Sequence, residues 1–89
     1  MFSIVLKRRA KKFIDRLPRN EKVRIVSAIE KLPEGDDIKQ LQGYDRIYRL
    51  RVGDYRILYT VNHAELIVII IDAGSEGVKI SVSMGKNLL

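Results

Sequence analysis

The sequence contains no cysteine and no tryptophan, and it has a single histidine among 89 residues. Without cysteine the chain can form neither disulfide bonds nor thiolate metal sites, and one histidine without such partners argues against a zinc site. We therefore expect no metal and no cofactor. Long apolar runs are absent too. The longest, Leu66 to Ile71, falls far short of the roughly 20 residues of a membrane-spanning helix.

The N-terminus also lacks the order of a signal peptide, because its basic residues follow the short apolar run instead of preceding it. We therefore expect a cytoplasmic protein that makes no contact with membranes. The length is enough for one small domain, which we place at residues 1–89. The chain contains no internal repeat and no low-complexity segment that would indicate a second domain.

Positive charge is concentrated in the first third of the chain. Residues 1–33 hold ten lysines and arginines against three acidic residues, whereas the rest of the chain is nearly balanced. A basic block of this density favours a polyanionic partner such as nucleic acid or an acidic protein. The alternative is an ordinary solvated helix surface.

The hydrophobic periodicity changes once along the chain. A short β-branched run at Phe2–Leu6 predicts a strand. Apolar residues then recur at helical spacing in residues 7–17 and 21–32, with Pro18 ending the first helix and Asn20 as a candidate N-cap of the second. We expect residues 36–46 to form a connector between the second helix and the later strands. Beyond it we expect strands at Ile47–Val52, Tyr55–Val61 and Leu66–Ile71, with a further candidate at Val78–Val82.

These elements predict an α+β fold in the order β-α-α-β-β-β(-β). The short loops between the later strands indicate an antiparallel sheet, and the N-terminal helical hairpin should pack on one face of it. Leu66–Ile71 is apolar at every position, so we expect a central strand that is covered on both faces. The first strand should join the sheet beside a later one.

The pair Gly53-Asp54 suits a type II′ hairpin turn, which fixes how the flanking strands pair. Arg51 then lies opposite Arg56, and Arg49 opposite Leu58, on the face away from the tyrosines and aliphatic residues. Directly opposed like charges destabilise a sheet. Either carboxylates of the chain neutralise these arginines, with Asp45, Asp54, Asp72 and Glu76 as candidates, or a bound anion such as RNA phosphate completes the site.

Two segments, "LKRRAKKFIDRLPRNEKVRIVSAIEKL" and "LQGYDRIYRLRVGDYRILYTV", resemble the RelE/ParE superfamily of toxin–antitoxin toxins over roughly residues 3–74. The most specific part is "YRLRVGDYRILY". The resemblance implies the fold that was deduced above. It also implies a cognate antitoxin partner and a RelE-like activity: metal-independent, ribosome-dependent cleavage of mRNA in the A site. The alternative is a ParE-like toxin that acts on DNA gyrase.

The resemblance assigns catalytic roles to Arg49, Arg51 and Arg56, with Arg56 at the scissile phosphate. Lys79 is a candidate for additional positive charge. Basic residues of the first helix would form a surface that binds the ribosome and its RNA: Lys7, Arg8, Lys11 and Lys12.

The C-terminus departs from the RelE pattern. Glu76 stands about where relatives carry a second arginine, and no aromatic residue follows Tyr59. A carboxylate next to Arg56 would neutralise the arginine and repel RNA. We therefore expect a weak nuclease or an inactive homologue that still binds antitoxin.

Overall fold

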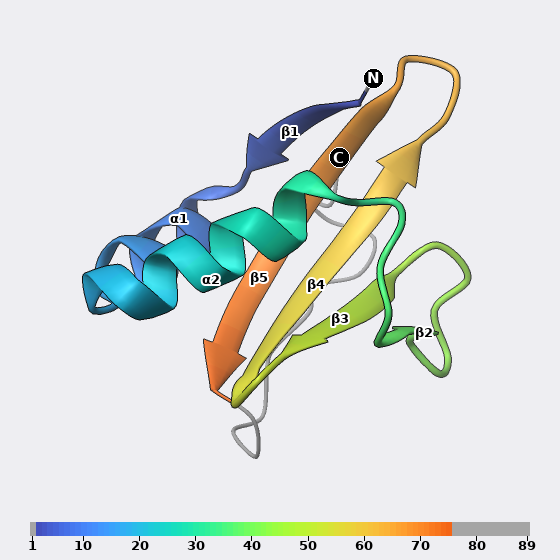
Figure 1. Ribbon diagram of the computed structural model, residues 1–89. Coiled ribbons are helices and arrows are strands. Elements are labelled where there is room, and N and C mark those ends of the chain that lie inside the picture. The colour runs from blue at the N-terminus through green and yellow to red at the C-terminus, as the bar shows by residue number, and fades with distance from the viewer. Residues whose placement is uncertain (1, 76–89) are drawn as a thin grey trace.

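A helical hairpin covers one face of a five-stranded sheet in the computed structural model, which describes residues 2–75 (Figure 1). The helices are α1 (Arg8–Asp15) and α2 (Arg19–Glu30). The strands are β1 (Ser3–Leu6), β2 (Ile38–Gln40), β3 (Tyr48–Val52), β4 (Tyr55–Asn62) and β5 (Ile67–Ser75). The predicted α+β class and the helical hairpin on one face are confirmed. The candidate strand Val78–Val82 lies outside the described residues.

The strands are ordered β1-β5-β4-β3-β2, so β5 is a central strand and β1 forms one edge. The pairs from β2 to β5 are antiparallel, but β1 runs parallel to β5, with Ser3 opposite Ile67. The predicted antiparallel arrangement is confirmed for β2–β5, and β1 adds one parallel pair that was not predicted. The helical hairpin is the reason, since it gives the chain a crossover between β1 and the later strands, which a parallel pair requires.

The segment expected to be a connector contains strand β2, which the periodicity did not reveal. Only three residues long, β2 has Ile38 opposite Leu50 and Gln40 opposite Tyr48. Such a strand is too short to show an alternating pattern, and its pairing with β3 depends on contacts that are distant in sequence. The backbone carbonyl of Asp37 extends this pairing by accepting a hydrogen bond of 3.0 Å from the Arg51 N–H.

Helix α2 begins at Arg19, with Pro18 and not Asn20 at its N-cap. The Pro18 carbonyl accepts the first helical hydrogen bond from the Lys22 N–H, at 2.9 Å. A proline fits this position because it has no N–H to satisfy and its φ of −56° is fixed by the ring. The helix therefore starts two residues earlier than predicted.

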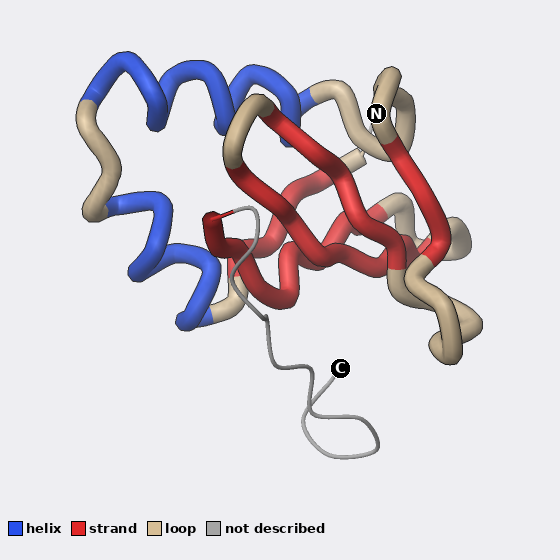
Figure 2. The backbone as a smooth tube through the Cα atoms, turned by 90° about the horizontal axis from the view of Figure 1, so that it is seen from below, coloured by secondary structure: helices blue, strands red, loops and turns tan. Residues whose placement is uncertain are grey.

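The core lies between the helices and the sheet face that carries the tyrosines and aliphatic residues (Figure 2). It includes Ile14 and Ile25 from the helices and Ile57, Tyr59 and Ile70 from the strands. Burial raises the pKa of Tyr59 to about 12, because an ionised phenolate is unfavourable among these apolar side chains.

Strand β5 is less completely covered than its composition predicts. Val68 and Ile70 are fully buried, but Ile67, Ile69 and Ile71 are only half-buried. Ile71 is the extra residue of a β-bulge, because Leu58 pairs with Asp72 while Tyr59 pairs with Ile70. The helices thus cover one face of this strand, and the second face is more open than expected.

Leu66 adopts a left-handed conformation with φ of +55° in the turn before β5, and its side chain is 44% exposed. This conformation costs an ordinary L-residue about 1–2 kcal/mol, whereas asparagine adopts it readily. We expect Leu66→Asn to have a free energy of unfolding about 1 kcal/mol higher than Leu66→Ala, measured by urea denaturation. The alanine variant controls for the lost side-chain packing. Equal stabilities would show that the backbone strain is not relieved.

Candidate nucleic-acid interface

The hairpin of β3 and β4 has the predicted register. Arg51 lies opposite Arg56, and Arg49 lies opposite Leu58. At the turn Gly53 has a φ of +57°, whereas Asp54 does not have a positive φ, which is the type II′ pattern. Paired residues share a face, so Arg49, Arg51 and Arg56 gather on one side of two neighbouring strands. We call this set the arginine cluster.

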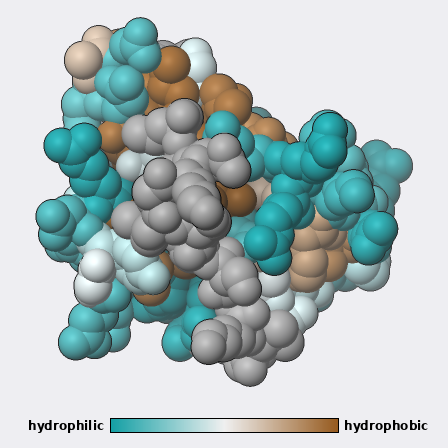
Figure 3. All heavy atoms as spheres, turned by 180° about the vertical axis from the view of Figure 1, so that it is seen from behind, coloured by the Kyte–Doolittle hydropathy of each residue, from teal (hydrophilic) through white to brown (hydrophobic). Residues whose placement is uncertain are grey.

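The arginine cluster belongs to the sheet face that the helices do not cover. The opposite face of the same strands carries Leu50, Val52 and Ile57, which are buried in the core under the helices. Figure 3 shows the molecule from the cluster's side, where hydrophilic residues surround smaller apolar patches. Exposure differs within the cluster: the side chain of Arg49 is 11% exposed and that of Arg51 is 46% exposed. Part of the positive charge is therefore accessible to a ligand.

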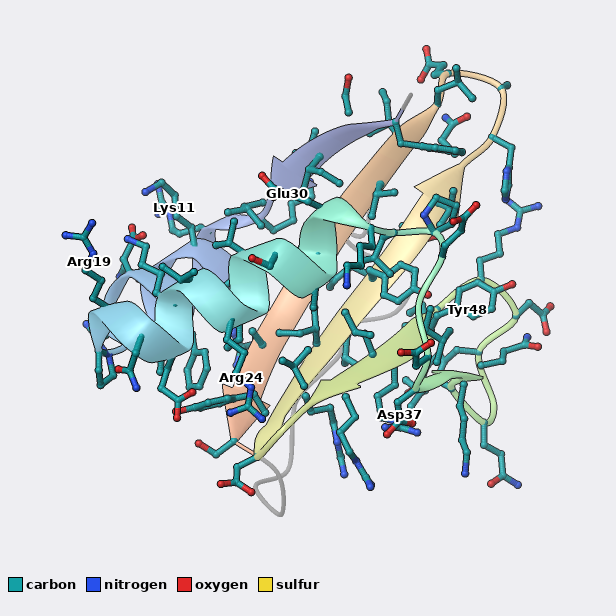
Figure 4. The ribbon with its side chains drawn as sticks, in the orientation of Figure 1. Lys11, Arg19, Arg24, Glu30, Asp37 and Tyr48 are labelled. Atoms are coloured by element: carbon teal, nitrogen blue, oxygen red, sulfur yellow. The ribbon has the colours of Figure 1, made fainter. Side chains whose placement is uncertain are left out.

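Asp37 is the carboxylate that pairs with the two arginines of β3. Its Oδ1 accepts a hydrogen bond from Arg49 Nη2 at 3.4 Å, and its Oδ2 lies 3.9 Å from Arg51 Nε. Figure 4 shows Asp37 beside β2 and β3. Sequence reasoning did not select this residue, because its position depends on the pairing of β2 with β3. Asp37 thus supplies one negative charge between the guanidinium groups of Arg49 and Arg51.

Arg49 is incompletely satisfied by this ion pair. Within residues 2–75, its buried Nη1 atom has no hydrogen-bond partner. A buried charged donor without a partner costs stability and favours binding of an anion. Among the described residues, the ion pair with Asp37 therefore satisfies Arg49 only in part.

Asp72, one of the carboxylates predicted to neutralise the cluster, pairs with a helix instead. It is 5% exposed and lies opposite Leu58, so it belongs to the same face as the arginine cluster. Its Oδ2 lies 3.7 Å from Arg9 Nη2, and its Oδ1 accepts a hydrogen bond of 2.9 Å from the Ala73 N–H. This ion pair brings Arg9 of α1 to the margin of the face, a placement that sequence reasoning missed.

The basic residues of the first helix are arranged only partly as predicted. Lys7 is half-buried at the N-cap, whereas Arg8 and Lys12 are exposed one turn apart on α1. Lys11 donates to Asp15 at 2.6 Å, and Lys22 approaches the same carboxylate at 3.2 Å. These two hydrogen-bonded lysines lower the pKa of Asp15 below its usual value. Lys11 is therefore ion-paired, and the freer cations of the predicted surface are Arg8 and Lys12.

Two residues of the sequence-based argument, Lys79 and Glu76, lie outside the described residues. Within residues 2–75, no helix is long and apolar enough to cross a membrane. What the described residues form is a small α+β domain with a cationic sheet face opposite its helices. A surface of this kind favours contact with negatively charged groups.

Comparison with known proteins places this domain in a family. The family described as "ParE toxin of type II toxin-antitoxin system, parDE" matches residues 4–76, most of the chain. The chain belongs to this family and thus to the RelE/ParE toxin superfamily. It is a RelE-like toxin of a type II toxin–antitoxin system.

Individual relatives agree with this assignment. A protein of Methanocaldococcus jannaschii that bears the toxin name RelE1 is 33% identical over 75 residues, which are 78% of this chain and 83% of the relative. In the archaeal RelE–RelB complex from Pyrococcus horikoshii, a chain with 26% identity superposes with a TM-score of 0.70, covering 85% of this chain and 96% of that one. The RelB–RelE complex of Methanococcus jannaschii gives 28% identity and a TM-score of 0.65, with coverage of 80% and 88%.

The contact of Asp37 with two arginines predicts that this carboxylate competes with an anionic ligand. We expect Asp37→Asn to bind a single-stranded RNA oligomer about fivefold more tightly at low salt, because a charge pair at 4 Å in water is worth about 1 kcal/mol. Binding can be measured by fluorescence anisotropy.

Asp36→Asn is the matched control, since it removes the same charge from the neighbouring residue. Within residues 2–75, Asp36 has no ion pair with an arginine. Equal tightening by both variants would contradict the prediction, because net charge alone would then explain the change.

Proposed function

We propose that this toxin is a RelE-like endoribonuclease that cleaves mRNA in the ribosomal A site. The observation that carries the proposal is the strand register, which gathers Arg49, Arg51 and Arg56 on the sheet face that the helices leave uncovered. Guanidinium groups suit this role because they present several donors in a planar fork that matches phosphate oxygens. The similarity to proteins named RelE supports the same proposed activity.

In the proposed reaction, the 2′-hydroxyl of one nucleotide attacks the adjacent phosphate. The 2′-hydroxyl gives its proton to water, the O–P bond to the 5′ oxygen of the next nucleotide breaks, that oxygen takes a proton from water, and a cyclic phosphate remains. Negative charge grows on the phosphate oxygens in the transition state. The arginine cluster would stabilise that charge, since arginine stays protonated and makes a poor general base. Preorganised donors of this kind are worth roughly 3–4 kcal/mol each.

The protein partner that we propose is a cognate antitoxin of the RelB kind. RelE chains from Pyrococcus horikoshii and Methanococcus jannaschii, which resemble this chain in fold, were solved in complexes with RelB. A partner that neutralises the toxin must either cover the cationic face or prevent it from reaching the ribosome. The basic residues Lys7, Arg8, Lys11 and Lys12 would contact ribosomal RNA in the absence of antitoxin.

The sequence beyond β5 leads us to propose that the nuclease is weakened. Glu76 replaces an expected arginine, and the expected aromatic residue is absent. A ParE-like action on DNA gyrase is the second candidate, favoured by the match to the ParE family description and by the altered C-terminus. The third is a toxin homologue whose remaining activity is antitoxin binding.

We expect Arg56→Ala to reduce cleavage of ribosome-bound mRNA by on the order of 100-fold, because it removes a donor to the developing phosphorane charge. Primer extension on translated mRNA measures the cuts. Arg19→Ala, at an exposed arginine of α2, is the control and should cleave normally. Undiminished cleavage by Arg56→Ala would refute its role. Cleavage complexes of gyrase, without mRNA cuts, would favour the second candidate.

The proposed weakening predicts that a substitution at Glu76 can increase the activity of the toxin. We expect Glu76→Arg to increase toxicity, because it restores positive charge where the RelE pattern has an arginine. Growth after induction of the toxin without its antitoxin is the measurement. Glu30→Arg reverses a charge on the exposed side of α2 and should leave growth unchanged. If both variants grow like the parent protein, Glu76 is not what weakens the toxin.

A further inference from the structure

The face of the sheet that carries the arginine cluster has additional cations at both of its margins. At one margin, Lys39 of β2 lies directly opposite Arg49 in the register of β2 and β3. Paired residues project from the same face, so Lys39 continues the cluster by one more strand. At the other margin, the ion pair with Asp72 holds Arg9 of α1. Neither residue belongs to the catalytic or ribosome-binding sets assigned above.

These five cations form a band that runs across the strands. The band begins at Arg9, which is ion-paired to Asp72 of β5. It continues with Arg56 on β4, the two arginines of β3, and Lys39 on β2. Neighbouring strands are about 4.8 Å apart, so the distance from β5 to β2 is about 14 Å. Asp37 and Asp72 are the carboxylates in contact with this band among the described residues.

Along the strands, the described residues that adjoin the arginine cluster on this face carry no charge. On β4, the residues that follow Arg56 on this face are Leu58 and Thr60, which are 2% and 7% exposed and uncharged. On β5, the residues opposite Thr60 and Asn62 are Ile69 and Ile67. A polyanion that followed the strands would leave the arginine cluster at Leu58 and would meet further cations, Lys7 and Arg46, only in the pocket beyond Thr60. A polyanion that crosses the strands stays in contact with the positive charge.

We propose that Arg9 and Lys39 bind the RNA backbone on either side of the arginine cluster, so that a single strand crosses the sheet from α1 to β2. This inference rests on the proposed function and specifies the path of its substrate. Both side chains can reach a phosphate. Arg9 is 66% exposed and its 3.7 Å contact with Asp72 leaves guanidinium donors available. Lys39 is exposed and has no ion pair within residues 2–75.

The salt dependence of RNA binding tests this path. For single strands, the slope of log K against log salt concentration changes by about 0.7 for each phosphate that the protein neutralises. We expect Lys39→Gln and Arg9→Gln each to make the slope shallower by about 0.7 in the full-length protein with a single-stranded RNA oligomer. Arg19→Gln removes the same charge at the far end of the helical hairpin (Figure 4) and should leave the slope unchanged.

Two further variants make the result decisive. Arg9→Lys and Lys39→Arg preserve the charge and should restore the parental slope, whereas a structural loss would not be rescued in this way. If Arg56→Gln makes the slope shallower but Lys39→Gln and Arg9→Gln do not, the proposed function stands and the crossing path is wrong. If none of the three changes the slope, the face does not bind RNA and both proposals fail. Equal effects at Arg19 would overturn the path as well, because the charge would then act without a defined site.

Discussion

The site depends on the two-residue turn at Gly53-Asp54, because this turn decides which side chains of β3 and β4 face the core. A slip of one residue would exchange the two faces and expose the aliphatic residues. Gly53 suits the turn because its φ is +57°, a backbone conformation that residues with a side chain rarely adopt. Burying Leu50, Val52 and Ile57 is worth several kcal/mol. The repulsion between Arg51 and Arg56 costs only tenths of a kcal/mol, so the core determines the register and the cationic face follows from it.

Two carboxylates among the described residues, Asp37 and Asp72, partly offset the positive charge of the sheet face. Asp37 contacts both arginines of β3 and is itself fixed by the backbone hydrogen bond to Arg51. Asp72 is held by Arg9 and by the N–H of the next residue. Each of these two carboxylates therefore lies at a margin of the band of cations. A folded protein can maintain such a surface because the carboxylates reduce the electrostatic repulsion between the cations. A bound phosphate can still accept hydrogen bonds from the guanidinium groups.

Patterns that are local in sequence predicted most of the fold and the position of the arginine cluster. The alternation of apolar and polar residues in Tyr48–Val52 and Tyr55–Asn62, together with the turn at Gly53-Asp54, was enough to predict how β3 and β4 pair. Both signals come from residues that are close together in the sequence. Three features depended on distant contacts and were missed: the strand Ile38–Gln40, the parallel pairing of β1, and the choice of Asp37 in place of the four predicted carboxylates. None of them leaves a periodic signal, since each is created only when the sheet assembles.

The two faces of the sheet contribute differently to the stability of the protein. The core face, with Ile57 and Tyr59, carries most of the buried apolar side chains, whereas the cationic face carries fewer, among them Leu58. Substitutions on the cationic face can therefore change the ligand without changing the register. Arg49 is an exception, because its side chain is largely buried and its ion pair with Asp37 connects β3 to the segment that leads into β2. At Arg49, ligand binding and stability are therefore coupled. A substitution of Arg49 would change the cationic face and would also weaken the attachment of β2 to the sheet.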